Sequence, residues 1–271
     1  MKVAPFRAWP LVVFVAIACG LVWLILGASQ LFGIPFTPLL ILGSWSPNIA
    51  AFIVIGLVLR EKGGIRALFA GWTRWRFPAA WYLAALSAPA LAALAVPVLA
   101  LFGVLPGPHA AVTPGAIFAI VAIEIVTGAT GEELGWRGFL QLRLQRRFSP
   151  LTSALIVGTA WAVFHTPLWL APGQAWASLP FGYFALVCVA SSVVIAWLVQ
   201  GTGASTAVAS LYHFLMNTGM NVVLLFGVPA PKLYTAFAIL LTLFATAPAF
   251  FLAARGRARS VDSILTPPRP S

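Results

Sequence analysis

Residues 9–31 read WPLVVFVAIACGLVWLILGASQL, and this stretch decides the fold class. It carries no charged residue over 23 positions, and a helix needs roughly 20 apolar residues to cross the hydrocarbon core of a bilayer. Lys2 and Arg7 precede it, as in a signal peptide, but the run is too long and lacks a convincing small-x-small cleavage site. We therefore predict an uncleaved membrane span.

Seven further apolar runs follow along the chain. They are Leu39–Leu59, Ala79–Phe102, Gly115–Leu134, Leu151–Leu170, Leu179–Val199, Ala204–Phe226 and Leu233–Ala254. The composition, 61% hydrophobic and 8% charged, is typical of a polytopic membrane protein. We predict an all-α bundle of about eight transmembrane helices in one membrane-embedded domain, residues 1–255. The fourth run is expected to continue as a polar helix to Arg147, and residues 256–271 to form a disordered, basic and Pro-rich cytoplasmic tail.

Basic residues gather on alternate connections between the runs. They are Lys2 and Arg7 before the first run, Arg60, Lys62, Arg66, Arg74 and Arg76 after the second, Arg143, Arg146 and Arg147 after the fourth, and Arg255, Arg257 and Arg259 after the eighth. The other connections contain one basic residue, Lys232. Because Lys and Arg near span ends stay in the cytoplasm, both termini are predicted to be cytoplasmic. The net charge of +11 then indicates contact with anionic lipid and not with nucleic acid, and we expect a multi-pass protein of the cell membrane.

Two further features of the sequence bear on which kind of membrane protein this is. Cys19 and Cys188 both lie in apolar runs, so we predict buried thiols and no disulfide framework or Cys-rich metal site. No internal repeat is visible, whereas many secondary transporters are built from repeated halves.

The fourth run carries charged residues inside a predicted span, where burying a charge in the bilayer costs free energy. Glu133 and Arg137 are four residues apart, so they share a helix face and are predicted to pair. Glu132 lies about 100° further round the helix and is free to face a cavity. We therefore predict one structural carboxylate, Glu133, and one candidate general base, Glu132. Gly131 and Gly135 form a small-xxx-small pair that predicts close approach of another helix.

Two later runs carry histidines. Trp161 and His165 lie one turn apart on one face, and Pro167 is expected to free a backbone carbonyl near the histidine. A stripe at four-residue spacing follows in the seventh run: His213, Asn217 and Asn221. Donors on such a stripe can hold a developing oxyanion. From the helical rise per residue, the polar groups of the three runs can meet toward mid-membrane.

Three ordered motifs carry a resemblance to a known family: GEELGWRGFL (131–140), WAVFH (161–165) and HFLMN (213–217). They resemble the Glu-Glu-xxx-Arg, aromatic-xxx-His and His-xxx-Asn or His-xxx-Asp motifs of the CAAX-protease and bacteriocin-processing (CPBP, or Abi) family, which includes the type II CAAX prenyl endopeptidases. The motif core covers about 115–221, under half of the chain. Trp161 stands where Phe is common in the family.

The resemblance implies an intramembrane endopeptidase that hydrolyses a peptide bond of a membrane-associated or lipidated protein with glutamate-activated water. The roles that it implies are water activation for Glu132, holding of the water for His165, oxyanion binding for His213 with Asn217, and support of the site for Glu133 and Arg137.

The cofactor is open at this level. Members of the family are often described as metalloproteases, and Glu132, His165 and His213 would offer three ligands to zinc with an open position for water. No His-Glu-xx-His pattern is present, and a metal-free glutamate mechanism has been proposed for the family. We expect catalysis without a cofactor, with zinc as the alternative.

Two other classes of function stay open. A proton-coupled transporter also places Glu, Arg, His and Asn at membrane depth, and a non-catalytic bacteriocin-immunity or scaffold protein could keep the same motifs. Glu124, two turns before Glu132, is expected to be a buried, hydrogen-bonded carboxyl. His109, in a connection, is expected at the surface.

Overall fold

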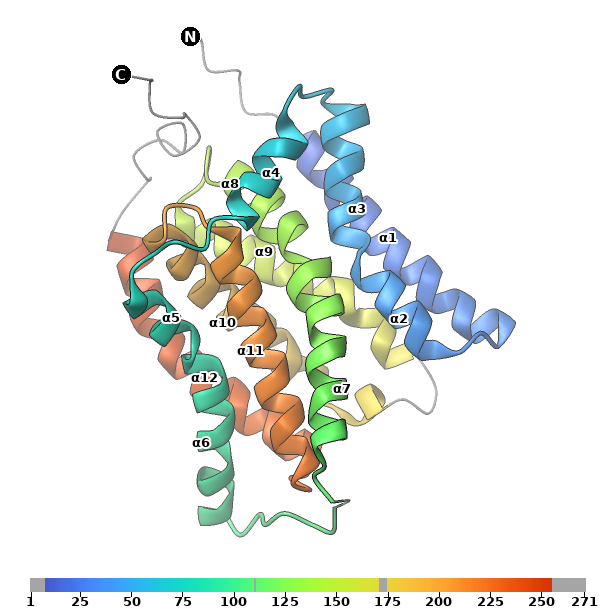
Figure 1. Cartoon of the computed structure of the whole chain (residues 1–271), viewed down its shortest axis with the longest axis vertical. Helices are drawn as coiled ribbons and strands as arrows, with labels where there is room; N and C mark the ends of the chain where they lie inside the picture. Colours follow the sequence, from blue (N-terminus) through green and yellow to red (C-terminus); the bar gives the residue numbers. More distant parts are fainter. Residues whose placement is uncertain (1–7, 110, 171–174, 255–271) are drawn as a thin grey trace.

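The computed structural model describes residues 8–109, 111–170 and 175–254, and this part is helical without any strand (Figure 1). Within these described residues, eight helical segments are long and apolar enough to span a membrane, as predicted. They are α1 (Trp9–Phe32); α2, α3 and η1 (Phe36–Ser44, Ser46–Ile53, Val54–Val58); α5 and α6 (Ala79–Ala85, Ser87–Leu101); the fourth span (Pro114–Leu144); α9 and η4 (Pro150–His165, Thr166–Leu170); α10 (Phe181–Gly201); α11 (Thr206–Leu225); and α12 (Ala230–Ala254). The short helices α4 (Gly64–Trp72) and η5 (Ala175–Ser178) lie in connections.

The fourth span is irregular, and the site is built on its irregular part. It begins as α7 (Pro114–Glu124), contains the π-helical segments η2 (Ile125–Ala129) and η3 (Leu134–Gln141), and ends as α8 (Leu142–Leu144). It continues past Leu134, as predicted, but the expectation of a helix to Arg147 is wrong because residues 145–147 form a turn. Single π turns inside helices are frequent at functional sites.

Side chains of the second span bond to the backbone around these π segments. Trp45 Nε1 donates to the carbonyl of Val126 at 3.0 Å. Asn48 Nδ2 donates to the carbonyl of Thr130 at 2.7 Å, and Asn48 Oδ1 accepts from the backbone N–H of Gly135 at 2.9 Å. Because a π turn displaces backbone groups from the α-helical pattern, such partners keep buried polar groups satisfied.

Glycines allow the second span to approach this closely. A Cβ atom at Gly135 would lie 2.4 Å from the carbonyl oxygen of Pro47, and one at Gly131 would lie 3.0 Å from that of Ser44. The predicted close approach of a helix to the Gly131–Gly135 pair is confirmed. The packing fixes the height of the Glu132–Glu133 segment against α2 and α3.

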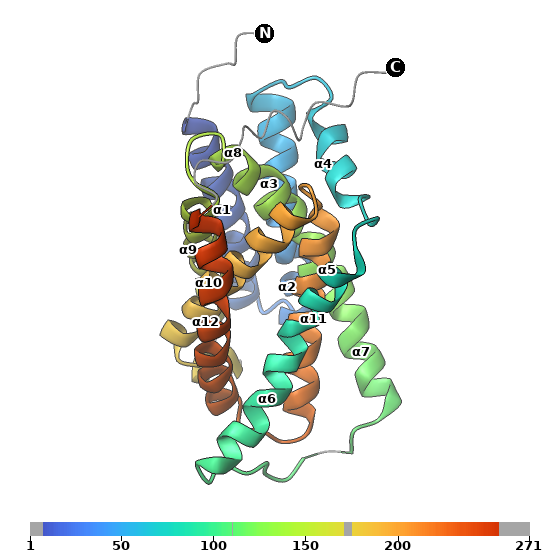
Figure 2. The ribbon, with the colours of Figure 1, turned by 90° about the vertical axis from the view of Figure 1, so that its left-hand side faces the viewer.

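The spans pack around α10 and present apolar surfaces outward. α10 packs against α9, α11 and α12, while α11 also packs on α6, α7 and η2, and α1 lies along α2 and α3 (Figures 1 and 2). Large apolar side chains point away from the bundle, among them Leu24, Leu31, Leu101, Phe118 and Phe250. An outward apolar surface of this extent suits lipid as the solvent.

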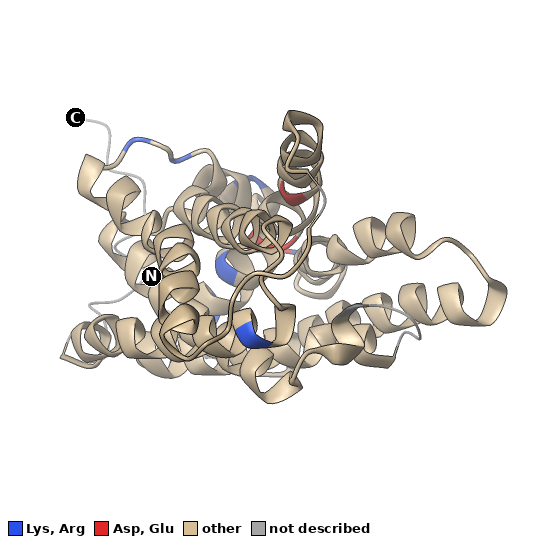
Figure 3. Cartoon of the chain, turned by 90° about the horizontal axis from the view of Figure 1, so that it is seen from below, with Lys and Arg blue, Asp and Glu red and all other residues tan. Residues whose placement is uncertain are grey.

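The two ends of the bundle differ in charge. The basic connections around α4 and α8 lie at the upper end in Figure 1, the end at which α1 begins and α12 ends. The loop residues 102–109, 111–113 and 226–229 lie at the lower end (Figure 2) and include no Lys, Arg, Asp or Glu, and most of the ribbon seen from below in Figure 3 is tan. Which end faces the cytoplasm stays a prediction. The basic residues near both termini and the tail at 256–271 lie outside the described residues, so the domain limits also stay predictions.

An ion pair and two hydrogen bonds hold the basic connection 60–78 to the bundle. Arg143 pairs with Glu61 at 2.6 Å. The Ser205 hydroxyl donates to the carbonyl of Arg74 at 2.7 Å, and the Arg74 guanidinium donates to the carbonyl of Gly203. Far from this end, His109 is exposed, as expected. Both cysteines are free; Cys188 is buried, as predicted, whereas the prediction of a buried thiol is wrong for Cys19, which is only partly buried.

Candidate active site

A cavity of about 150 Å³ lies inside the bundle. Its walls come from α1, α2, the fourth span, α9, α10, α11 and α12. The walls are mostly apolar, with Val22, Phe184 and Met216 among them. The carboxylate, imidazole and amide side chains that face it are Glu124, Glu132, His165, His213, Asn217 and Asn221, and no Lys or Arg of the described residues lines it.

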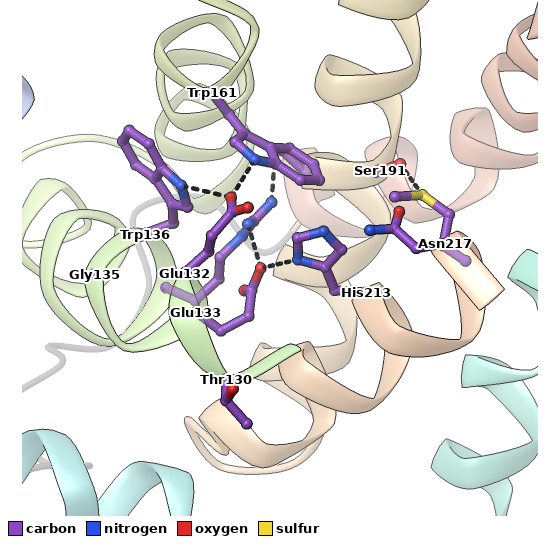
Figure 4. Close-up of polar contacts among 12 residues, drawn as sticks. Thr130, Glu132, Glu133, Gly135, Trp136, Trp161, Ser191, His213 and Asn217 are labelled. Atoms are coloured by element: carbon purple, nitrogen blue, oxygen red, sulfur yellow. Dashed lines mark hydrogen bonds and ion pairs between the residues drawn. The ribbon is translucent and has the colours of Figure 1, made fainter. Parts of the chain in front are cut away.

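Glu132 lies at the turn between η2 and η3, with 4% of its surface exposed. Its Oε2 accepts two hydrogen bonds, from Trp136 Nε1 at 3.2 Å and from Trp161 Nε1 at 2.7 Å (Figure 4). Both indoles use the same oxygen, so Oε1 is left without a hydrogen bond among the described residues. The carboxylate is therefore held on one side and open to a ligand on the other.

Glu133 and Arg137 form the predicted pair. The guanidinium lies 2.8 Å from Glu133 Oε1, both side chains are 0% exposed, and neither lines the cavity. Arg137 also donates to the Ser192 hydroxyl at 2.9 Å and lies over the Trp161 ring, 4.5 Å from its centroid. The prediction that Glu132 and Glu133 face different surroundings is confirmed.

His213 joins the third motif to the first. α11 begins at Thr206, where the Ser205 hydroxyl accepts from the backbone N–H of Val208, and this places His213 two turns inside the helix. His213 Nδ1 lies 2.8 Å from Glu133 Oε1 (Figure 4). Because a carboxylate only accepts hydrogen bonds, Nδ1 carries a proton, and Nε2 is the nitrogen that remains for the cavity.

His165 ends α9 and faces the cavity from another span. Its Nδ1 lies 2.8 Å from the carbonyl oxygen of Trp161, and its ring packs edge-on against Phe184. The expectation that Pro167 frees the carbonyl beside this histidine is wrong. The carbonyl in contact belongs to Trp161, whereas the one four residues before Pro167 accepts from the Thr166 hydroxyl. His165 Nε2 is therefore the nitrogen free for a ligand.

The asparagine stripe of α11 is turned toward Glu124. Asn217 Nδ2 donates to Glu124 Oε2 at 2.9 Å, and Asn221 Nδ2 donates to Glu124 Oε1 at 3.0 Å. Glu124 is 9% exposed. The expectation of a buried, hydrogen-bonded carboxyl at this position is confirmed.

The arrangement does not present a metal-binding set. In the described part of the chain, no three His, Cys, Asp or Glu side chains lie close enough together to hold one ion. Glu132 Oε2 and the Nδ1 atoms of His165 and His213 are already engaged in hydrogen bonds. These bonds leave Glu132 Oε1 and the Nε2 atoms of His165 and His213, which are the atoms that zinc would bind, so the dependence on a metal stays a prediction.

Several side chains that build the site were not predicted from the sequence. They are Trp136, Asn48 and Ser192, which contact the Glu132–Arg137 segment. Spacing offered a signal for Trp136, which lies four residues after Glu132. Asn48 was detectable as an amide within an otherwise apolar run.

Two comparisons with known proteins agree with this picture. Residues 113–219 match the family described as type II CAAX prenyl endopeptidase Rce1-like. The "CAAX prenyl protease 2" of Methanococcus maripaludis is 30% identical over 106 residues, which are 37% of this chain and 39% of that relative. The chain therefore matches well under half of the length of this relative.

The matched family segment contains all three motifs and the residues that face the cavity from the fourth span, α9 and most of α11. The protein is an integral multi-pass membrane protein with eight apolar spanning helices in its described part, and its segment 113–219 is similar to the Rce1-like type II CAAX prenyl endopeptidases.

Proposed function

We propose that this chain is an intramembrane endopeptidase that hydrolyses a peptide bond with water activated by Glu132. One observation carries the proposal. Glu132, His165, His213 and Asn217 come from three separate spans and line a single cavity inside the bundle. Buried polar groups at membrane depth are costly, and their convergence on a cavity supports use in chemistry.

In the proposed first step, Glu132 Oε1 takes a proton from a water molecule held by His165 Nε2. The water oxygen forms a bond to the carbonyl carbon of the substrate, and the carbonyl π electrons move to its oxygen. Fixed donors aimed at this oxyanion stabilise the charge that develops.

Asn217 supplies an amide N–H for the oxyanion, and His213 supplies its Nε2. Since Nδ1 of His213 already donates to Glu133, donation from Nε2 requires the imidazolium form. The buried charges of Glu133 and Arg137 neutralise each other. In this proposal His213 carries its second proton before the water attacks, and the imidazolium lies between Glu133 Oε1 and the developing oxyanion.

In the second step, the C–N bond breaks and Glu132 returns its proton to the departing amine. This use of one carboxyl as base and then as acid follows general acid–base catalysis. Trp136 and Trp161 position the carboxylate through Oε2, so that Oε1 carries the proton.

The proposed substrate is a membrane-associated or lipidated protein that reaches the cavity from the bilayer or from the basic end of the bundle. The mostly apolar walls and the absence of Lys and Arg among the described lining residues favour an apolar segment over an anionic one. We propose the cell membrane as the location, no nucleic-acid partner, and catalysis that requires no metal cofactor.

The test uses the full chain reconstituted in liposomes with farnesylated and unmodified peptides as substrates. Glu132→Gln keeps the shape of the side chain but removes the base, so cleavage should fall by about 10² to 10⁴-fold. Glu61→Gln is the matched control, because Glu61 is a partly exposed carboxylate in a connection.

Three outcomes would contradict the proposal. Cleavage at the wild-type rate by Glu132→Gln would show that Glu132 is not the general base. Cleavage that stops when a zinc chelator is added and returns when zinc is restored would contradict the metal-free mechanism. A folded wild type that cleaves neither peptide would favour the immunity or transport alternatives, which proton-flux measurements on the same liposomes separate.

A further inference from the structure

Glu124 is a second carboxylate in the cavity, and none of the three motifs contains it. It ends α7, directly before the π segment η2, eight residues before Glu132. With 9% of its surface exposed, it is nearly buried in an apolar surrounding. A carboxylate in such a place needs partners that offset its lost hydration.

Its partners are two amides of α11. Asn217 Nδ2 donates to Oε2 at 2.9 Å and Asn221 Nδ2 donates to Oε1 at 3.0 Å, so each carboxylate oxygen holds one amide. Asn221 Nδ2 also donates to the backbone carbonyl of Asn217 at 3.0 Å. The three side chains form a closed unit, which we call the Glu124 clamp.

The clamp determines which way the Asn217 amide points. An asparagine amide has nitrogen on one side and oxygen on the other, and rotation by 180° exchanges them. A carboxylate accepts hydrogen bonds and cannot donate them, so only the nitrogen of Asn217 can face Glu124. The second N–H on this nitrogen is then fixed in direction and available to a ligand.

The backbone of the fourth span also lies close to Asn217. A Cβ atom at Gly128 in η2 would lie 3.1 Å from Asn217 Nδ2 and 2.7 Å from His213 Nε2. The fourth span therefore approaches Asn217 at two positions, the carboxylate of Glu124 and the backbone of Gly128. Figure 4 shows the Asn217 nitrogen on the side of the His213 imidazole.

We propose that Glu124 is a positioning residue that holds the amide of Asn217 with its N–H toward the substrate carbonyl oxygen, and that Asn221 completes this clamp. The inference rests on the proposed peptidase function, because it needs an oxyanion to stabilise. Without the clamp, the amide can turn its oxygen toward the developing negative charge, and part of the stabilisation is lost. Ground-state binding depends little on this donor, so the effect falls on kcat.

The test is a double-mutant cycle on the full chain in liposomes, with kcat and KM measured for the peptide that wild type cleaves. Glu124→Gln should lower kcat by about tenfold, the equivalent of one net hydrogen bond, with KM nearly unchanged. Asn217→Ala should lower kcat by about 10² to 10³-fold, as removal of one oxyanion donor does. The double variant should equal Asn217→Ala alone, because Glu124 then has no donor to position.

Two controls separate positioning from damage to the fold. Glu61→Gln makes the same chemical change outside the cavity and should keep wild-type kcat. Asn221→Leu removes one arm of the clamp and leaves the Glu124–Asn217 bond, so it should lower kcat in the same direction by about threefold, a fraction of one hydrogen bond. Folding of each variant is checked by gel filtration and thermal unfolding.

A folded Glu124→Gln variant with wild-type kcat would overturn the inference. It would also be overturned if the fall in kcat of the double variant equalled the product of the falls in the two single variants. If Glu124→Gln does not fold, wild-type kcat in Asn221→Leu would overturn it. Failure of the peptidase proposal looks different, since Glu132→Gln would then retain activity or the wild type would show none.

Discussion

The indole N–H of Trp161 lies 2.7 Å from Oε2 of Glu132, and this bond ties the second motif to the first. The aromatic residue of the second motif therefore acts as a hydrogen-bond donor in this chain. Phenylalanine is common at this position in the family that the motifs resemble, and it cannot form this bond because its ring has no N–H group. Trp136 donates to the same oxygen over 3.2 Å, so two indoles from different spans fix one carboxylate.

Trp161→Phe should lower kcat by about tenfold, because it removes one hydrogen bond to a buried carboxylate and keeps most of the aromatic volume. Trp136→Phe is the matched variant and should lower kcat by a smaller factor, since the hydrogen bond of Trp136 to Glu132 is longer than that of Trp161. Measurement of kcat for peptide cleavage by both variants in liposomes checks that Trp161→Phe loses more activity than Trp136→Phe. Equal activity of Trp161→Phe and wild type would show that the bond does not position Glu132.

Arg137→Met should destabilise the protein by about 3–5 kcal/mol, because it leaves the buried Glu133 without its ion-pair partner. Arg143→Met breaks the ion pair with the partly exposed Glu61 and should cost at most about 1 kcal/mol. The free energy of unfolding in mixed detergent micelles distinguishes them. A similar loss in both variants would contradict the view that burial decides the effect.

The double variant Glu133→Gln with Arg137→Met sharpens this prediction. It removes both charges together, so it should be less destabilised than Arg137→Met alone. Its activity should stay low, because His213 loses the carboxylate that orients its Nδ1. Recovery of stability together with full activity would contradict the role assigned to Glu133.

Gly135→Ala should destabilise the bundle by about 1–3 kcal/mol, the usual range for overpacking. The new Cβ atom would lie 2.4 Å from the carbonyl oxygen of Pro47, and backbone cannot turn aside as a side chain can. Gly20→Ala is the control, since no described atom outside the neighbouring backbone of α1 lies within 4 Å of its Cβ position. Unfolding curves that coincide for the two variants would refute the close approach of α3.

Gly128→Ala should reduce activity more than stability. Its Cβ would press on side-chain atoms and not on backbone, namely Nε2 of His213 at 2.7 Å and Nδ2 of Asn217 at 3.1 Å, so these two side chains would shift from their present positions. Displacement of catalytic groups by about 1 Å can cost roughly 10²-fold in rate. We expect a loss of this size in kcat with a nearly unchanged unfolding midpoint, and wild-type kcat would argue against the placement of His213 and Asn217.

Local patterns account for what the sequence predicted well. The eight spans follow from apolar run length, because a helix that crosses a bilayer satisfies its own backbone groups within one segment. The Glu133–Arg137 pair and the divergence of Glu132 from it follow from helical geometry over four residues. The glycine pair Gly131–Gly135 predicted a close helix contact, although not which helix supplies it.

The sequence by itself thus determined the membrane-spanning class, the spans and the side chains that share a helix face. Only the tertiary structure decided that Asn48 stabilises the π segments, that His213 contacts Glu133, and that Glu124 holds Asn217 and Asn221. These contacts join residues 80 or more positions apart. They depend on how separate spans rotate and pack against one another, which no local periodicity specifies.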